Sequence, residues 1–185
     1  MKAPRSRTYA ATAGRAPDRD APTPQTPFAL GSVTKSFTAL AVMPLVEAGM
    51  IELDASVRPY LPWFRVADPE ASGRITVRHL LTQTSGMSML SGTACPADLD
   101  DRPQVRERQA RGRSTLEFSR PVGESFRYCN LHYNVLGLVI EAAGEQSYAE
   151  YGGEHICAAL DRGPTRASSA RAEQHGPAMG HRYWP

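Results

Sequence analysis

Three apolar stretches mark the chain, and each predicts a helix. The longest covers residues 36–48, where only three positions are polar, so we expect a helix that is buried on most of its sides. Gly49 follows this stretch, in the position where a glycine commonly ends a helix. Pro44 lies inside it and removes one backbone hydrogen bond, so the helix should bend there or be less regular than its pattern suggests.

Two further helices are predicted along the chain. Thr76 is a suitable N-cap for a short helix over residues 77–81, and Gly86 is assigned the C-terminal capping role after it. A longer apolar stretch over residues 133–143 predicts another helix, closed by Gly144. These patterns predict a mainly helical protein.

The chain divides into one body and two flanking segments. Residues 1–26 show no sustained period and predict a poorly ordered N-terminal segment, while residues 161–185 predict an irregular C-terminal one. Residues 27–160 hold all the predicted helices, and 185 residues suffice for one domain with a sizeable core. No apolar run reaches the ~18 residues of a transmembrane helix, and the N-terminus has no apolar region typical of a signal peptide, so we expect neither.

Composition excludes several classes of partner. A nucleic-acid-binding chain would be basic with interleaved aromatic residues, whereas the net charge is only +2 and the Asp- and Arg-rich stretch 91–114 predicts a solvated helix or mobile loop. The three cysteines, Cys95, Cys129 and Cys157, have no metal-ligand spacing and form no even set for a disulfide framework. We therefore expect no cofactor, no metal ion and no nucleic-acid partner.

The first turn of the longest helix carries candidate chemistry at Ser32 and Lys35, which share one helix face. A serine hydroxyl is a weak nucleophile until a neighbour takes its proton, and a lysine can take it only when neutral. The positive end of a helix favours both the neutral lysine and a developing oxyanion. Of the 21 lysines and arginines only Lys2 and Lys35 are lysines, so Lys35 stands out. The alternative is that Ser32 only caps the helix and Lys35 points into solvent.

A second candidate is the pair Tyr128 and Asn130, which follows a Pro/Gly turn and precedes the helix over residues 133–143. Side chains two apart on an extended backbone can point the same way. A phenol can relay a proton between a serine and a leaving group, and an amide can hold a substrate carbonyl. The alternative is core packing for Tyr128 and turn formation for Asn130. A nucleophilic Cys129 is disfavoured, because only His132 is near it in sequence.

Together these motifs resemble the serine beta-lactamase and DD-peptidase family, in particular its class C beta-lactamase-like branch. The matching motifs are Phe-x-x-Gly-Ser-x-x-Lys-Ser-Phe at 28–37, Ile-Thr-x-Arg-His-Leu-Leu-Thr-x-Thr-Ser-Gly at 75–86, and Phe-x-Tyr-x-Asn at 126–130. The resemblance covers roughly residues 27–160. It implies an α+β fold with an all-helical part, an antiparallel sheet and an active site at their junction. Here the helical part would be present and most of the sheet missing.

The resemblance also implies a role for each site residue. Ser32 would be the acylated nucleophile, with Lys35 as its partner, and its backbone N–H would form half of the oxyanion hole. Tyr128 would be the proton relay and Asn130 the substrate-binding amide. The expected substrate is a small-molecule or peptide acyl compound: a beta-lactam, a D-Ala-D-Ala peptide, or a small ester or amide.

One part of the family pattern has no counterpart. The family's third motif, Lys- or His-(Ser/Thr)-Gly, would follow Asn130, yet no lysine occurs after that residue. By this resemblance the chain is truncated at both ends. Two hypotheses follow: a serine hydrolase that acylates Ser32, or a catalytically inactive fragment that serves as a helical binding or scaffold module. The family usually works outside the cytoplasm, but no export signal assigns a compartment here.

Overall fold

The computed structural model of this chain describes residue 28, residues 30–87 and 120–160, and residue 165. The expectations for residues 1–26, for the stretch 91–114 and for nearly all of 161–185 lie outside the described residues. Within the described part, all regular structure is helical apart from isolated bridge residues, among them Ser56 and Thr76, which pair in an antiparallel bridge. This agrees with the predicted predominance of helix.

The 3-10 turn η1 (Gly31–Val33) leads directly into helix α1 (Thr34–Glu47). The alternative in which Ser32 only caps the helix is wrong, because Ser32 lies inside η1 and makes no capping bond. Its hydroxyl is instead held by side chains described below. Gly31 adopts a left-handed φ of +54°, a conformation that residues with a Cβ rarely tolerate. Gly31 therefore makes the turn that presents Ser32.

Helix α1 is covered on most of its sides. Its exposed residues are Ser36, Leu40 and Glu47, which lie along one side of the helix, and the others are buried or half-buried. The expectation of burial on most sides is therefore confirmed within the described residues. The helix is continuous through Pro44. Leu40, whose carbonyl loses its bond there, lies on the exposed side, where water can replace that bond.

The end of α1 follows the sequence prediction. Gly49 has a left-handed φ of +72°, and the Met50 N–H donates to the Leu45 carbonyl at 2.8 Å. This is the backbone pattern of a Schellman C-cap, which satisfies carbonyls that the helix end leaves free.

After α1 the chain passes through loops that bury apolar side chains, then forms α2 (Pro69–Arg74) and α3 (Val77–Leu81). Thr76 caps α3, as predicted, by accepting a bond from the His79 N–H at 3.2 Å. The predicted capping role of Gly86 is wrong, because the left-handed residue that directly follows the C-cap Thr82 is Gln83, with φ of +58°, and Gly86, with φ of +82°, lies three residues further on. The Thr84 N–H donates to the His79 carbonyl at 2.9 Å, which makes Gln83 the turning residue of the cap.

Helix α6 (Asn130–Gly144) is the longest, and it begins three residues before the predicted start at 133. Glu145, with φ of +54°, forms its C-cap, so the closing role assigned to Gly144 is wrong. A Cβ on Gly144 would lie 3.0 Å from the Tyr151 ring. Gly144 is therefore required by close packing and not by the turn.

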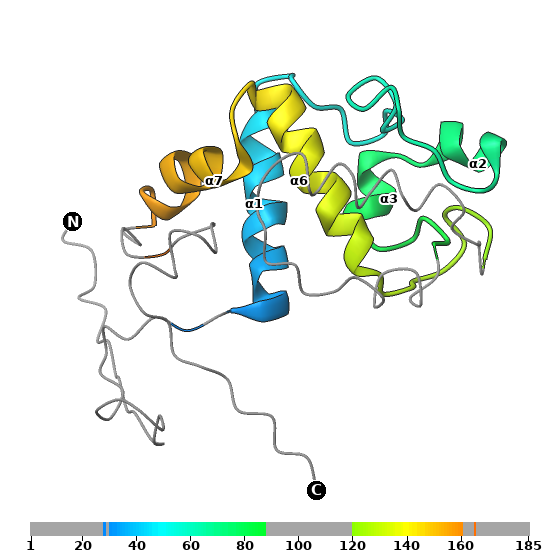
Figure 1. The fold of residues 1–185 in the computed structure, drawn as a ribbon, viewed down its shortest axis with the longest axis horizontal. Helices are drawn as coiled ribbons and strands as arrows, with labels where there is room; N and C mark the ends of the chain where they lie inside the picture. Colours follow the sequence, from blue (N-terminus) through cyan, green and yellow to red (C-terminus); the bar gives the residue numbers. More distant parts are fainter. Residues whose placement is uncertain (1–27, 29, 88–119, 161–164, 166–185) are drawn as a thin grey trace, which may run out of the picture.

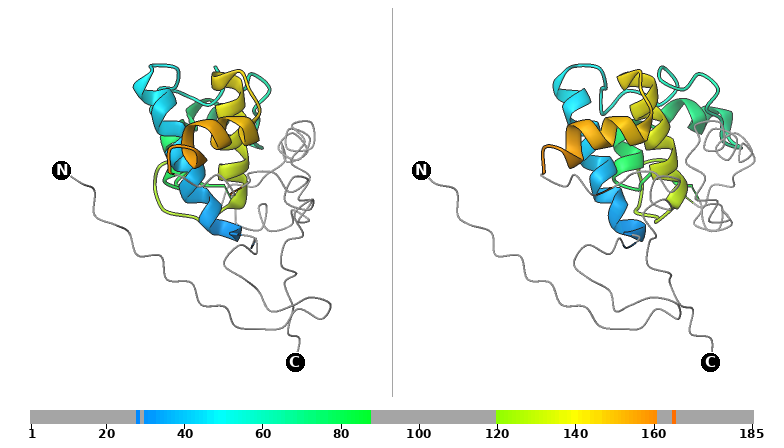
Figure 2. Two further views of the ribbon diagram at one scale, coloured as in Figure 1. Left: turned by 90° about the vertical axis from the view of Figure 1, so that its left-hand side faces the viewer. Right: turned by 60° about the vertical axis from the view of Figure 1, so that its left-hand side comes forward.

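Helices α1 and α6 lie side by side and form the centre of the described structure, with α3 against α6 (Figure 1). Helix α7 (Tyr148–Tyr151) and the π-helical turn η2 (Gly152–Cys157) lie across the first two (Figure 2). The core between these elements contains mainly aliphatic side chains. Among the described helices, none combines the length and the apolar character needed to cross a membrane.

Candidate active site

The structure brings all four predicted site residues together. Ser32 is exposed on η1, and Lys35 follows on the first turn of α1, where its Nζ donates to Ser32 Oγ at 3.1 Å. Ser32 Oγ lies 2.7 Å from the hydroxyl of Tyr128, 96 residues away in sequence. The Tyr128 hydroxyl donates to Asn130 Oδ1 at 2.9 Å. We call these four residues the serine relay.

The serine relay fixes the direction of each hydrogen bond. A phenol has one proton, and Tyr128 directs it to Asn130. Ser32 then donates its own proton to Tyr128, and its oxygen accepts from Lys35. The protons therefore all point from Lys35 towards Asn130. The Ser32 proton therefore already points at the Tyr128 oxygen, the atom that could accept it.

Electrostatics favours Tyr128 as that acceptor. The Lys35 ammonium and the Ser32 hydroxyl beside it lower the pKa of Tyr128 below the usual tyrosine value. The Lys35 Nζ also lies 4.9 Å from the centroid of the Tyr128 ring. A positive charge at this position stabilises a phenolate.

Tyr133 is a site residue that the sequence analysis missed. The Lys35 Nζ lies 5.8 Å from its ring centroid, and its hydroxyl donates to the Leu81 carbonyl at 3.1 Å. Burial raises the pKa of Tyr133, so it stays a neutral phenol. Its spacing was a usable signal, because a residue three positions after Asn130 shares its helix face.

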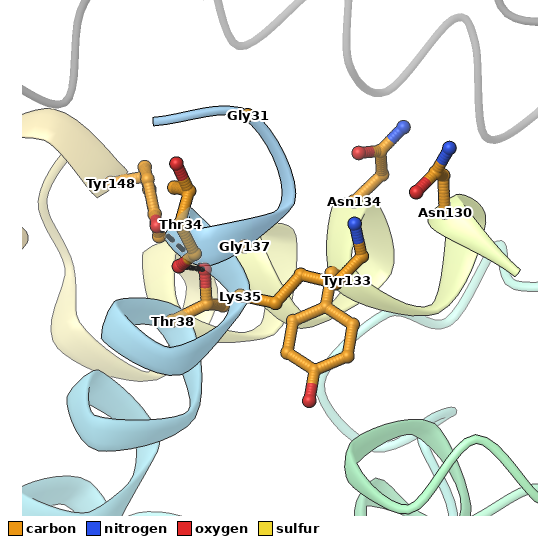
Figure 3. A pocket seen from close by; sticks show the side chains of 9 residues that line it. All are labelled: Gly31, Thr34, Lys35, Thr38, Asn130, Tyr133, Asn134, Gly137 and Tyr148. Atoms are coloured by element: carbon orange, nitrogen blue, oxygen red, sulfur yellow. Dashed lines mark hydrogen bonds between the residues drawn. The ribbon is translucent and has the colours of Figure 1, made fainter. Parts of the chain in front are cut away.

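A pocket of about 310 Å³ adjoins the serine relay between α1, α6 and α7. In Figure 3, Lys35 extends from α1 towards Tyr133, while Asn130 and Asn134 project from successive turns of α6. At the opposite end the Thr38 and Tyr148 hydroxyls are 2.7 Å apart. The nine lining residues are Gly31, Thr34, Lys35, Thr38, Asn130, Tyr133, Asn134, Gly137 and Tyr148.

Neither of the two described cysteines, Cys129 and Cys157, lines this pocket. Cys129 is fully buried, and the ring nitrogens of His132 face Ser85 and Gln83. A Cys129–His132 nucleophile is therefore not formed. Within the described ranges, no cluster of three or more His, Cys, Asp and Glu side chains could hold a metal ion.

Comparisons with known proteins find related sequences. A family model described as Beta-lactamase matches residues 5–185. Protein flp of Staphylococcus aureus (strain MW2) is 31% identical over 138 residues, which are 71% of this chain and 26% of flp. Penicillin-binding protein 4 of Amycolatopsis lactamdurans is 33% identical over 127 residues, 65% of this chain and 31% of that protein. This chain thus spans between a quarter and a third of the length of these curated relatives.

A solved structure shows the same fold. EstCE1, a hydrolase with promiscuous acyltransferase activity, superposes with a TM-score of 0.60 at 28% sequence identity. The match covers 72% of this chain and 38% of EstCE1. The described helices therefore correspond to part of a larger fold in that neighbour.

Proposed function

Because this chain belongs to the beta-lactamase family, we propose that it is a serine hydrolase in which Ser32 attacks an acyl carbonyl. The proposed substrates are beta-lactams, D-Ala-D-Ala peptides and small esters or amides. The pocket beside the serine relay has room for a small acyl group. Its hydroxyl and amide groups, among them those of Thr38 and Asn134, suit a substrate with polar substituents.

The observation that carries the proposal is the unbroken set of hydrogen bonds from Lys35 through Ser32 and Tyr128 to Asn130. Before acylation, the Tyr128 phenol gives up its own proton to water. Ser32 Oγ then bonds to the carbonyl carbon while its proton passes to the ionised Tyr128 oxygen. Lys35 stabilises the ionised form of Tyr128. The bond from the carbonyl carbon to the leaving nitrogen or oxygen then breaks, and the leaving group takes the proton from Tyr128.

Hydrolysis reverses these proton movements. Water attacks the acyl-Ser32 ester, its proton passes to Tyr128, and Ser32 regains a proton as the carboxylic acid leaves. The start of α1 lies next to Ser32. The Ser32 N–H and the positive end of this helix would stabilise the oxyanion in both steps.

Intact-protein mass spectrometry tests this proposal. The chain is incubated with a fluorophosphonate and, separately, with a penicillin, and we expect a single covalent adduct that Ser32→Ala loses. Ser36→Ala is the matched control, because Ser36 is exposed one turn further along the same helix. An adduct that persists in Ser32→Ala contradicts the assignment of the nucleophile.

The alternative function is an inactive binding or scaffold module of the same family. It is favoured by apolar side chains exposed near the serine relay: Val33 is 58% and Phe126 is 65% exposed. A cooperatively folded sample that forms no adduct with either reagent would support this alternative over the hydrolase.

A further inference from the structure

One residue holds the backbone on both sides of Tyr128. The Gln83 carbonyl accepts a bond from the Arg127 N–H at 2.7 Å. The Gln83 side-chain Oε1 accepts another from the Cys129 N–H, also at 2.7 Å. Cys129 is extended, with φ of −149°, and N–H groups two residues apart point the same way on an extended chain. Gln83 therefore holds the N–H groups of the two residues on either side of Tyr128.

This double clamp depends on the unusual backbone of Gln83. Its left-handed φ of +58° is uncommon for a residue with a Cβ. Gln83 is nevertheless buried, and both its carbonyl and its side chain reach the segment before α6. Strained backbone that is fixed by its surroundings is frequent at functional sites.

The imidazole of His132 fixes the orientation of the Gln83 side chain. His132 Nδ1 lies 3.3 Å from Gln83 Oε1, and this oxygen can only accept, so Nδ1 carries the proton. His132 Nε2 then accepts from the Ser85 hydroxyl at 2.6 Å. The Ser85 oxygen in turn accepts from the Met87 N–H at 3.2 Å. His132 and Ser85 are both 0% exposed, so water does not compete for these bonds.

We propose that Gln83 and His132 are positioning residues, which hold the Arg127–Cys129 backbone so that the Tyr128 hydroxyl stays against Ser32. Neither residue lines the pocket, so both act through Tyr128. The effect on catalysis rests on the proposed function, because Tyr128 matters for acylation only if it serves Ser32. We call Gln83, Ser85 and His132 the buried clamp.

The test reads the ionisation of Tyr128 directly. In the full chain, tyrosines carry a 13C label at Cζ, and Tyr128→Phe assigns the Tyr128 signal. Gln83→Met keeps a similar length but removes the acceptor oxygen. We expect the pKa of Tyr128 to rise towards the ordinary value of ~10, because the ring moves away from Lys35 and Ser32. The Tyr148 signal on α7 should not change, and fluorophosphonate labelling should slow by about tenfold or more.

Two further variants make the result decisive. Ser85→Ala removes the donor to His132 and the acceptor of the Met87 N–H, but leaves both bonds that Gln83 makes to the Arg127–Cys129 segment. It should shift the pKa of Tyr128 in the same direction by less, and it decides the question if Gln83→Met does not fold. Thr84 lies in the same loop, and among the described residues its side chain bonds only Thr82, so Thr84→Ala should match the parent.

Unchanged titration of Tyr128 and unchanged labelling in the folded variants would overturn the positioning role. If the parent chain is not labelled at all, the proposed hydrolase fails, while the titration of Tyr128 still tests the clamp.

Discussion

Two sets of polar side chains meet at the segment that precedes α6, and they differ in their exposure to water. The serine relay is open: Ser32 is exposed, and Lys35, Tyr128 and Asn130 are only partly buried. The buried clamp is closed, with Ser85 and His132 fully inaccessible. An open set can exchange protons with a substrate, whereas a closed set keeps one arrangement of donors and acceptors. The short segment before α6 therefore contacts reactive, exposed side chains on one side and rigid, buried side chains on the other.

The largest effect should come from breaking the open set at Tyr128. We expect Tyr128→Phe to slow labelling of Ser32 by a fluorophosphonate about 10²–10⁴-fold, the range for loss of a general base. Stability to urea should change little, because the ring remains and its hydroxyl is only partly buried. Time-resolved mass spectrometry measures the rate.

Tyr133→Phe is the matched control, since the Tyr133 hydroxyl bonds the Leu81 carbonyl and not Ser32. Labelling at the parental rate in Tyr128→Phe would instead assign the proton transfer to Lys35, which is the role that the sequence first indicates.

Breaking the closed set should act on stability. His132→Leu leaves the buried Ser85 O–H without its acceptor and removes one of the two donors to Gln83 Oε1. We expect the free energy of unfolding to fall by about 2 kcal/mol, since a buried polar group without a partner costs ~1–3 kcal/mol. Urea denaturation followed by circular dichroism measures it. A loss below that of an exposed substitution such as Ser36→Ala would contradict the closed arrangement.

The same residue makes stability depend on pH. Burial lowers the pKa of His132 from 6.5 to about 4, so between these values the unfolded chain binds a proton that the folded chain does not. The stabilisation is complete above pH 6.5 and is lost as the pH falls to about 4, by up to about 3 kcal/mol. Urea midpoints at pH 7, 5.5 and 4 measure the loss. His132→Leu should lack this part of the pH dependence; if its midpoints fall as steeply as the parent's, other groups are responsible.

The open set was more accessible to sequence reasoning than the closed one. Ser32 with Lys35 and Tyr128 with Asn130 are local pairs, whose spacing alone suggests a shared direction, and a resemblance to a family linked the two pairs. The buried clamp joins Gln83 to His132, which are 49 positions apart in the sequence. A pattern of nearby residues cannot predict a contact over this distance.

The error at the end of α3 has the same origin. Gly86 does have a positive φ of +82°, but the residue that turns the chain directly after the helix is Gln83, because its bonds from Arg127 and Cys129 hold it in the left-handed conformation. Tertiary contacts decided this point.

The smallest effect should come from an exposed pair that belongs to neither set. Arg78 on α3 makes a bidentate pair with Asp54, at 2.7 and 2.8 Å, and its hydrogen bonds lower the pKa of the Asp54 carboxyl. Both side chains are exposed, so water and salt compensate for most of what the pair contributes. We therefore expect Asp54→Asn to shift the urea midpoint far less than His132→Leu, and the difference from the parent to shrink further at high salt. If Asp54→Asn shifts the urea midpoint as much as His132→Leu does, then the geometry of a polar contact, and not its burial, determines how much it contributes to the stability of this protein.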